Sequence, residues 1–299
     1  MRDGEWRFTA MASPCLLHLA GRRKVDLPAA AAASIAEVNR IERKFSRYRE
    51  DSVVGFINRS AGNKEGVEVD AETASLLDYA ATGFAQSQGL FDITSGVYRR
   101  AWDFSVPGLP DPERLEACRK RVGWDRVRWQ RPRLVLPIGG MEIDFGGFGK
   151  EYAADRVVAV CKSRGVKRGY VNLGGDVAVI GPGRDGEAWR VGIQHPRRTN
   201  AAFAHIDLAG GAIATSGDYE RYFELDGKRY CHILNPLTGW PVQSYRSISV
   251  VAELCIVAGT LASTAMLRGP TQPDWLESTG APYLTMDGKG SLGGTLGYV

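Results

Sequence analysis

The sequence predicts a mixed α/β (α+β) fold built as one unit over residues 1–299. Segments with the alternating apolar pattern of strands are interleaved with segments that carry apolar residues at helical spacing. No internal repeat and no linker of biased composition divides the chain. With 299 residues, 44% of them hydrophobic, the chain can bury a large core. These three observations favour a single mixed α/β unit.

Four segments place apolar residues three or four positions apart, which is the spacing of one helix face. We expect these helices at residues 29–45, 71–87, 149–165 and 256–267. The predicted strands are shorter and alternate between apolar and polar residues. We expect them at residues 8–19, 127–129, 133–136, 169–173, 176–180, 189–193, 203–208, 222–225, 228–230, 247–252 and from 283 onward. Proline and glycine interrupt residues 105–140, so we expect mostly loop there.

The charge balance argues against a nucleic-acid partner. The chain has 38 basic and 34 acidic residues, a net charge of +4, and the basic residues are scattered. The densest basic stretches, at residues 22–24 and 197–198, are too short for a nucleic-acid footprint.

The cysteines and the N-terminus favour a reducing, cytoplasmic setting. The five cysteines are far apart and include no C-x-x-C pair, so neither a disulfide framework nor a zinc site is expected. No apolar run has the length of a membrane span, and the first residues are charged where a signal peptide would be apolar. We therefore expect a cytoplasmic protein without a signal peptide or membrane span.

Residues 214–239 carry the densest set of binding signals. Asp226-Gly227 predicts a hairpin turn, and Asn235-Pro236 opens a second tight turn. Ser216 and the following glycine allow a backbone to approach a bulky ligand, and His232 adds a donor that titrates near neutral pH. This segment predicts a ligand-binding hairpin without naming a reaction.

A glycine-rich stretch, Asp144-Phe-Gly-Gly-Phe-Gly-Lys150, joins a predicted strand to a predicted helix. Bare amide groups at a helix N-terminus favour an anion, and Lys150 would face a phosphate as a point charge. Asp144 would accept hydrogen bonds from a ligand ring or sugar. The spacing matches neither of the common nucleotide-binding loops, so a turn required only by packing is the alternative.

Three other short motifs are ambiguous when taken alone. Asp92 and Thr94 in Phe-Asp-Ile-Thr-Ser-Gly would contact a ligand or cap a helix. Tyr48 would be a stacking platform or a core residue. Residues 172–176, Asn-Leu-Gly-Gly-Asp, favour a tight hairpin.

The order of these motifs is more specific than any one of them. The chain contains Met-Ala-Ser, Phe-Ser-x-Tyr with Asn58 ten residues later, Phe-Asp-x-Thr, Asp-x-Gly-Gly-x-Gly-Lys, Asn-x-Gly-Gly-Asp, Ser-Gly-Asp-Tyr-Glu-Arg and His-Ile-x-x-Pro-x-Thr-Gly. From about residue 8 to its end, the chain resembles the ApbE family of FAD:protein FMN transferases. The resemblance implies an ApbE-type, T-fold-like single unit with FAD in a central cleft.

The resemblance also implies a reaction. Relatives transfer FMN from FAD to a Ser or Thr of an acceptor flavoprotein, release AMP and depend on Mg²⁺. Others hydrolyse FAD, as metal-dependent pyrophosphatases, or only bind it. Both alternatives therefore stay open for this chain.

The resemblance assigns roles by position. Met11 and Tyr48 would contact the flavin or adenine, Asp92, Ile93, Thr94, Asp144 and Lys150 would line the cofactor, and His232 and Ile233 would approach the pyrophosphate. The backbone carbonyl of Gly147 would ligate the metal. A divalent ion with Lys150 and His232 would neutralise the phosphate oxygens, and a carboxylate beside the metal would serve as the base.

The chain departs from the family at the C-terminal metal motif. Where relatives have Asp-Ala-Leu-Ala/Ser-Thr, with the Asp and Thr as ligands, this chain has Gly259-Thr-Leu-Ala-Ser263. Glu151 also follows Lys150, where relatives have glycine. We expect Glu151 to replace the lost carboxylate, because Mg²⁺ is commonly bound through one or two carboxylates. Complementing the helix dipole is the alternative role for an acid at that position.

Overall fold

The computed structural model describes residues 2–272 and 274–298. Its largest element is an eight-stranded antiparallel sheet with the strand order β1-β2-β6-β7-β10-β13-β14-β15. The strands are β1 (Arg2–Ala10), β2 (Ser13–Gly21), β6 (Arg168–Leu173), β7 (Asp176–Gly181), β10 (Ala212–Gly217), β13 (Tyr245–Ala252), β14 (Tyr283–Asp287) and β15 (Leu292–Gly294).

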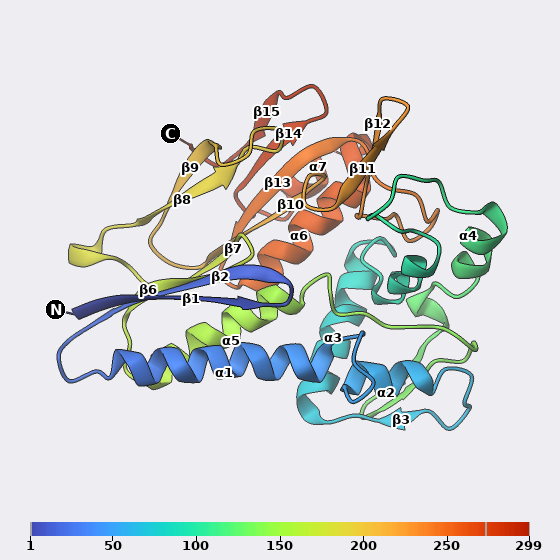
Figure 1. The fold of residues 1–299 in the computed structure, drawn as a ribbon, viewed down its shortest axis with the longest axis horizontal. Helices are drawn as coiled ribbons and strands as arrows, with labels where there is room; N and C mark the ends of the chain where they lie inside the picture. Colours follow the sequence, from blue (N-terminus) through green and yellow to red (C-terminus); the bar gives the residue numbers. More distant parts are fainter. Residues whose placement is uncertain (1, 273, 299) are drawn as a thin grey trace.

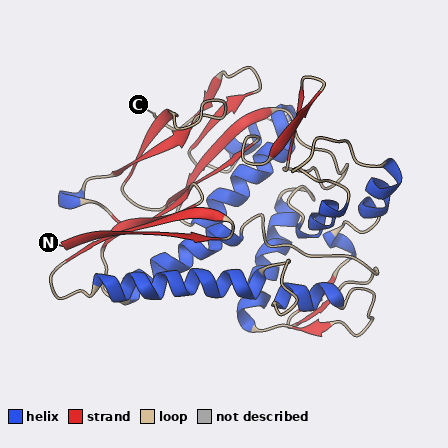
Figure 2. Cartoon of the chain, viewed as in Figure 1, coloured by secondary structure: helices blue, strands red, loops and turns tan. Residues whose placement is uncertain are grey.

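Three long helices cover one face of this sheet, as Figures 1 and 2 show. They are α1 (Leu27–Phe45), α5 (Gly149–Ser163) and α6 (Cys255–Arg268). Alternate residues of β7 face opposite sides, as expected for a strand buried on both faces. Ala178 and Ile180 join the core beneath the helices, whereas Val177 and Val179 pack with the hairpin of β8 (Trp189–Gln194) and β9 (Ala202–Leu208).

Helices α2 (Val53–Arg59), α3 (Ala71–Gln86) and α4 (Pro112–Arg119) lie beyond one end of α1, together with the small sheet β3 (Val67–Glu68), β5 (Arg133–Val135) and β4 (Arg128–Gln130) (Figure 1). Helix α7 (Asp274–Ser278) packs against α6, and β11 (Tyr222–Leu225) and β12 (Lys228–Cys231) form a separate hairpin. Short 3₁₀ helices are η1 (Ile93–Arg100), η2 (Trp124–Arg126), η3 (Arg184–Gly186) and η4 (Gly269–Thr271).

The predicted strand over residues 8–19 is wrong in one respect, because the structure forms a hairpin there. Ala10 pairs with Ser13, and Met11 and Ala12 form the two-residue turn with φ of 51° and 57°. Positive φ at both positions matches the right-handed twist of the flanking strands. Such turns usually contain glycine or asparagine, so Met-Ala carries no recognisable turn signal.

Among the described residues, three α-helices were not predicted from the sequence: α2, α4 and α7. Helix α4 lies within residues 105–140, where we expected loop. Asp111 accepts the backbone N–H of Arg114 and Pro112 begins the helix, a combination typical of helix starts. Helix α2 begins after Ser52, whose hydroxyl accepts the N–H of Gly55 at 2.8 Å.

Helix α6 is held in place by groups from neighbouring helices. Its own N-cap, Leu254, offers no side-chain acceptor. The carboxylate of Asp155 on α5 instead accepts the N–H groups of Cys255 and Ile256 at 2.8 and 3.0 Å. The hydroxyl of Tyr79 on α3 lies at hydrogen-bond distance from two oxygens of α6. They are Thr260 Oγ1 at 2.9 Å and the Ile256 carbonyl oxygen at 3.0 Å. The Asp155 carboxylate satisfies donors at the start of the helix, and Asp155 and Tyr79 together fix α6 relative to α3 and α5.

The turn after β12 is anchored on a separate aromatic core. The hydroxyl of Tyr98 donates to the Pro236 carbonyl at 2.9 Å, and the indole N–H of Trp102 donates to the Gly239 carbonyl at 2.8 Å. Gly239 has φ of 74°, and a Cβ there would lie 2.7 Å from the Tyr98 ring. A glycine is therefore required for this turn to pack.

All five cysteines are buried and free, in agreement with the prediction of no disulfide framework. Over the described part of the chain, no helix has both the length and the apolar character needed to cross a membrane.

Candidate functional site

The glycine-rich loop before α5 is positioned by two buried phenylalanines. Phe145 and Phe148 are at most 2% exposed, and their ring centroids lie 5.1 Å apart. Phe148 also packs against Phe91. Gly146 and Gly147 lie between these anchors and are exposed. The loop therefore presents the Gly147 backbone at the surface, as a backbone ligand would require.

Asp144 lies at the start of this loop and is paired with Arg47. The Arg47 Nη1 lies 2.7 Å from Asp144 Oδ2, and the Gly146 N–H donates to Asp144 Oδ1 at 2.9 Å. Burial opposes the charge of Arg47, but Asp144, Tyr48 and Glu142 together outweigh it, so the pKa of Arg47 is raised. The Arg47 Nε is buried and has no hydrogen-bond partner in the structure.

Tyr48 stands beside this ion pair and is 70% exposed. Its hydroxyl accepts a hydrogen bond from Arg47 at 2.9 Å, and the guanidinium lies 5.0 Å from the ring centroid. An exposed aromatic ring of this kind is available for stacking, whereas a core role for Tyr48 is excluded.

Asp92 caps the 3₁₀ helix η1. One carboxylate oxygen accepts the N–H and the hydroxyl of Thr94 at 2.7 and 2.6 Å, and the other accepts the N–H of Trp124 at 3.0 Å. Burial raises the pKa of Asp92. The intervening Ile93 carbonyl accepts the Asp144 N–H at 2.8 Å, which ties this turn to the glycine-rich loop. The side chains of Asp92 and Thr94 thus satisfy internal groups, and their cofactor contact stays a prediction.

Lys150, in the first turn of α5, forms an ion pair with Asp176 at the start of β7. Lys150 Nζ lies 3.0 Å from Asp176 Oδ2, and the other oxygen accepts the Thr215 N–H at 3.2 Å. The side chain of Asp176 is only 4% exposed, and that of Lys150 is 31% exposed. Burial opposes the lysine charge, but Asp176 together with Glu151 and Glu220 outweighs it, so the pKa of Lys150 is raised.

Glu151, the next residue, turns inward against Gly259 of α6. Glu151 is 7% exposed, and its Oε2 is buried without a hydrogen-bond partner. A Cβ on Gly259 would lie 2.5 Å from Glu151 Oε1 and 2.9 Å from its Cδ. The carboxylate therefore fills the space that a side chain at position 259 would need. Burial and then Asp176 raise the pKa of Glu151 to about 8, against an opposing effect of Lys150.

Ser263 lies one helical turn after Gly259, on the same face of α6. Its hydroxyl forms a hydrogen bond of 2.8 Å with that of Ser216 on β10. Position 216 directly follows Thr215, whose N–H binds Asp176. Strands β7 and β10 thus bring the lysine–carboxylate pair and the two hydroxyls to adjoining positions beside α6.

His232 and Ile233 follow strand β12. The His232 Nδ1 lies 3.3 Å from the Arg221 carbonyl, so the Nδ1–H donates and Nε2 keeps its lone pair. Burial, together with the charges of Arg221 and Lys150, lowers the pKa of His232 to about 4, although the hydrogen bond to the Arg221 carbonyl acts to raise it. His232 is therefore neutral near pH 7, and charge neutralisation falls to Lys150. Ile233 packs at the edge of the α6 core.

Met11 occupies the turn between β1 and β2. Its N–H donates to Glu42 Oε1 at 2.9 Å, and its side chain packs at the edge of the main core. The contact of Met11 with the flavin or adenine stays a prediction.

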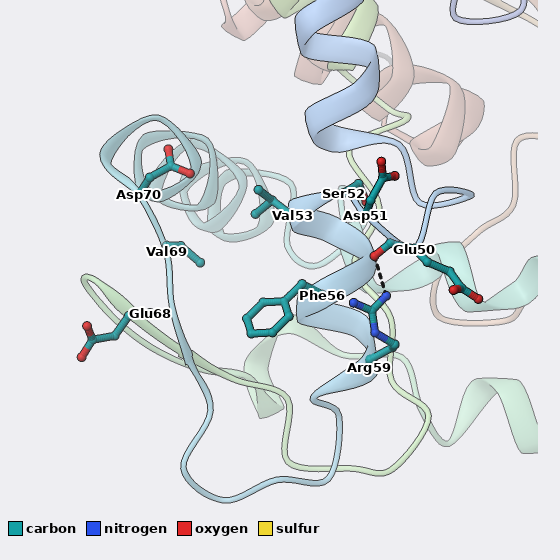
Figure 3. Close-up of a pocket in the computed structure, with 9 residues that line it drawn as sticks. All are labelled: Glu50, Asp51, Ser52, Val53, Phe56, Arg59, Glu68, Val69 and Asp70. Atoms are coloured by element: carbon teal, nitrogen blue, oxygen red, sulfur yellow. Dashed lines mark hydrogen bonds between the residues drawn. The ribbon is translucent and has the colours of Figure 1, made fainter.

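An open pocket of about 360 Å³ lies beside α2 (Figure 3). It is lined by Glu50, Asp51, Ser52, Val53, Phe56, Arg59, Glu68, Val69 and Asp70, none of which is a predicted site residue. Three of its carboxylates pair with basic side chains: Asp51 with Arg49, Glu68 with Arg133 and Asp70 with Lys44. A central cleft for FAD therefore stays a prediction.

Comparison of the sequence with known proteins shows which family the chain belongs to. The family model for the ApbE family matches residues 11–284. The chain belongs to the ApbE family. It is 31% identical over 235 residues to an FAD:protein FMN transferase of Vibrio cholerae, covering 77% of this chain and 70% of that protein. A relative of the same name from Treponema pallidum is 31% identical over 247 residues, which cover 76% and 68% of the two chains.

Solved ApbE structures confirm the predicted fold. The ApbE protein of Thermotoga maritima superimposes with a TM-score of 0.90 at 32% identity, covering 98% of this chain and 97% of that one. The flavinyl transferase ApbE of Pseudomonas stutzeri gives a TM-score of 0.86 at 26% identity, with 98% and 95% covered. The ApbE-type mixed α/β fold is therefore shown for this chain.

Sequence reasoning missed two residues that shape this ApbE site. Arg47 precedes Tyr48 and neutralises Asp144, but an arginine at a helix end is also typical of dipole complementarity. Asp176 was assigned to a tight hairpin, and that hairpin exists, because Leu173 pairs with Asp176 across two glycines. Its pairing with Lys150 depends on the sheet order, which the sequence does not reveal.

The oxygen donors of the site are compatible with the Mg²⁺ expected for the family. Among the described residues, no three His, Cys, Asp or Glu side chains gather as a metal site. Mg²⁺ does not need such a cage, because it usually takes one or two carboxylates, waters and substrate phosphates. A buried carboxylate oxygen without a partner, Glu151 Oε2, fits that chemistry.

Proposed function

We propose that this protein transfers FMN from FAD to a Ser or Thr hydroxyl of an acceptor protein and releases AMP. The observation that carries the proposal is the combination of an exposed glycine-rich loop, a paired lysine beside it and membership of the ApbE family. Its relatives named FAD:protein FMN transferase support the flavin donor and the protein acceptor.

The step exchanges one P–O bond for another. The acceptor hydroxyl oxygen forms a bond to the phosphorus of the FMN half, the bond from that phosphorus to the bridging oxygen breaks, and AMP leaves with that oxygen. The hydroxyl proton must go to a base. Such transfer needs charge neutralisation on the phosphate oxygens and placement of the attacking oxygen in line with the leaving one.

The residues divide these tasks by their charge and position. Lys150 keeps its positive charge beside Asp176 and would hold the pyrophosphate. Neutral His232 has a free Nε2 lone pair and would accept the hydroxyl proton, as an alternative to a carboxylate beside the metal. Tyr48 would stack on the ring system, with Met11 and Ile93 lining the bound FAD.

A divalent metal would complete the site. The Gly147 carbonyl, Glu151 and the Ser263 hydroxyl are the oxygen donors that this chain offers for it. When bound, Mg²⁺ would neutralise charge on the phosphate oxygens. Gly259 contributes no side chain, so its part is to leave room for a donor from another element.

The experiment incubates the purified chain with FAD, Mg²⁺ and an acceptor peptide that contains Ser or Thr, and measures AMP and the peptide mass. The proposal predicts AMP together with an FMN-sized mass gain on the peptide, and no gain when the hydroxyl residue is replaced by alanine. AMP and free FMN without peptide modification would establish an FAD pyrophosphatase instead. Bound FAD without AMP at any metal concentration would establish a flavin-binding protein.

A further inference from the structure

The side chain of Glu151 occupies the space into which a side chain at position 259 would project. Glu151 reaches this space from the first turn of α5, and Gly259 borders it from the middle of α6. A Cβ added at position 259 would meet Oε1, Cγ and Cδ of Glu151 at 2.5, 2.7 and 2.9 Å. Real Cβ atoms essentially never show contacts below 3.0 Å, so a side chain at position 259 would force the Glu151 carboxylate to move out of this space.

The carboxylate placed there has no protein partner for one of its oxygens. Glu151 Oε2 is buried and accepts no hydrogen bond. Buried carboxylates normally pair with a cation or accept hydrogen bonds, because an isolated buried charge is costly. The neighbouring Lys150 is hydrogen-bonded to Asp176, so two buried carboxylates face one lysine. When both carboxylates are ionised, the cluster is short of one positive charge.

The groups around Glu151 include several oxygen donors, and the buried thiol of Cys255 lies in the same cluster. The hydroxyls of Ser216 and Ser263 lie beside the same face of α6, one turn beyond Gly259. The remaining nearby acid, Asp155, has both oxygens engaged by the N-terminal N–H groups of α6. Oxygen ligands with one free carboxylate favour a hard divalent cation such as Mg²⁺ over a soft metal.

We propose that Glu151 supplies the protein carboxylate of a divalent-cation site against α6, and that Gly259 is the residue that admits it. This proposal rests on the proposed flavin transfer for its purpose, because the cation would meet the substrate phosphates there. It predicts that the carboxylate can be moved from position 151 to position 259 only when both residues are changed together. A carboxylate at 151 requires glycine at 259, and a carboxylate at 259 requires a small residue at 151.

The test measures binding of Mn²⁺ alone by the loss of the free-ion EPR signal, without FAD or turnover. Wild type should bind about one Mn²⁺ per chain. Glu151→Gln, which keeps the size and removes the charge, should weaken binding at least tenfold. Gly259→Ala should do the same, because its methyl group displaces the Glu151 carboxylate.

The paired exchange separates this proposal from simple disruption. Gly259→Asp alone should lose Mn²⁺ binding and lower the melting temperature measured in EDTA, because two carboxylates compete for one volume. Glu151→Gly with Gly259→Asp should recover both. A Glu142→Gln variant is the control, because that buried carboxylate is already held by Arg99 and Arg100 and should leave Mn²⁺ binding unchanged.

Three results would overturn the proposal: no Mn²⁺ binding by wild type, unchanged binding in Glu151→Gln, or no recovery in the double variant. The peptide assay tests the proposed function independently of Mn²⁺ binding. Flavin transfer to the peptide with unchanged Mn²⁺ binding in Glu151→Gln would refute the role of Glu151 and leave the proposed function standing. Normal Mn²⁺ results with no peptide modification would refute the proposed function alone.

Discussion

Replacing Lys150 by methionine should destabilise the protein by about 2–4 kcal/mol, because it breaks a partly buried ion pair. The magnitude follows from the unequal exposure of the partners. Asp176 is 4% exposed and would keep only the Thr215 N–H at 3.2 Å. Asp176→Asn should cost less, about 1–2 kcal/mol, because the Lys150 side chain is 31% exposed and its ammonium group can turn toward water.

A double-mutant cycle isolates the pair. The free energy of unfolding is measured by urea denaturation, with tryptophan fluorescence as the probe. We expect Lys150→Met and Asp176→Asn to be coupled by about 1–2 kcal/mol, so the double variant is more stable than the sum predicts. The matched control is Arg190→Met with Asp207→Asn, a pair at the same 3.0 Å but exposed on both sides, which should show no measurable coupling. Equal coupling in both cycles would refute the argument from burial.

Three further predictions concern other parts of the molecule. Burial acts to raise the pKa of Glu72, but hydrogen bonds from Arg40 and two other side chains lower it to about 2 from 4.5. The contribution of Glu72 to the free energy of unfolding should therefore be full above pH 4.5 and be lost as the pH falls through about 2. Glu72→Gln should flatten this part of the curve of unfolding free energy against pH, and an unchanged curve would contradict the assignment. Asp92→Ala should cost about 2–4 kcal/mol in urea denaturation, because it leaves the buried N–H of Trp124 unpaired; a loss below about 0.5 kcal/mol would exclude a capping role. Tyr48→Ala should weaken FAD binding about 2- to 10-fold by fluorescence titration without changing stability, and an equal loss in Phe56→Ala, which is also exposed, would argue against stacking by Tyr48.

Turn chemistry decided which hairpins the sequence could predict. Asp226-Gly227 and the two glycines before Asp176 supply residues that readily adopt positive φ, and both hairpins were predicted. Met11 and Ala12 adopt the same conformation without such residues, so one strand was predicted where two pair. The amphipathic helices were predicted to within two residues at either end, because their apolar spacing is local information.

The candidate site was predictable as a set of residues but not as an arrangement. Motif order identified the glycine-rich loop, Lys150 and the unusual Glu151. Pairing of Lys150 with Asp176 depends on how β7 and α5 pack, which is long-range information. The contact between Glu151 and Gly259 joins residues far apart in the chain and on two helices, and only the structure reveals that one fills the space left by the other.

The most direct test of the account is whether the wild-type chain joins FMN to a hydroxyl-bearing peptide. Purified protein is incubated with FAD and Mg²⁺, and intact peptide mass and AMP are followed together. We expect the two products to appear in equal amounts and EDTA to abolish both. AMP formed at the same rate without acceptor, with the peptide mass unchanged, would contradict it.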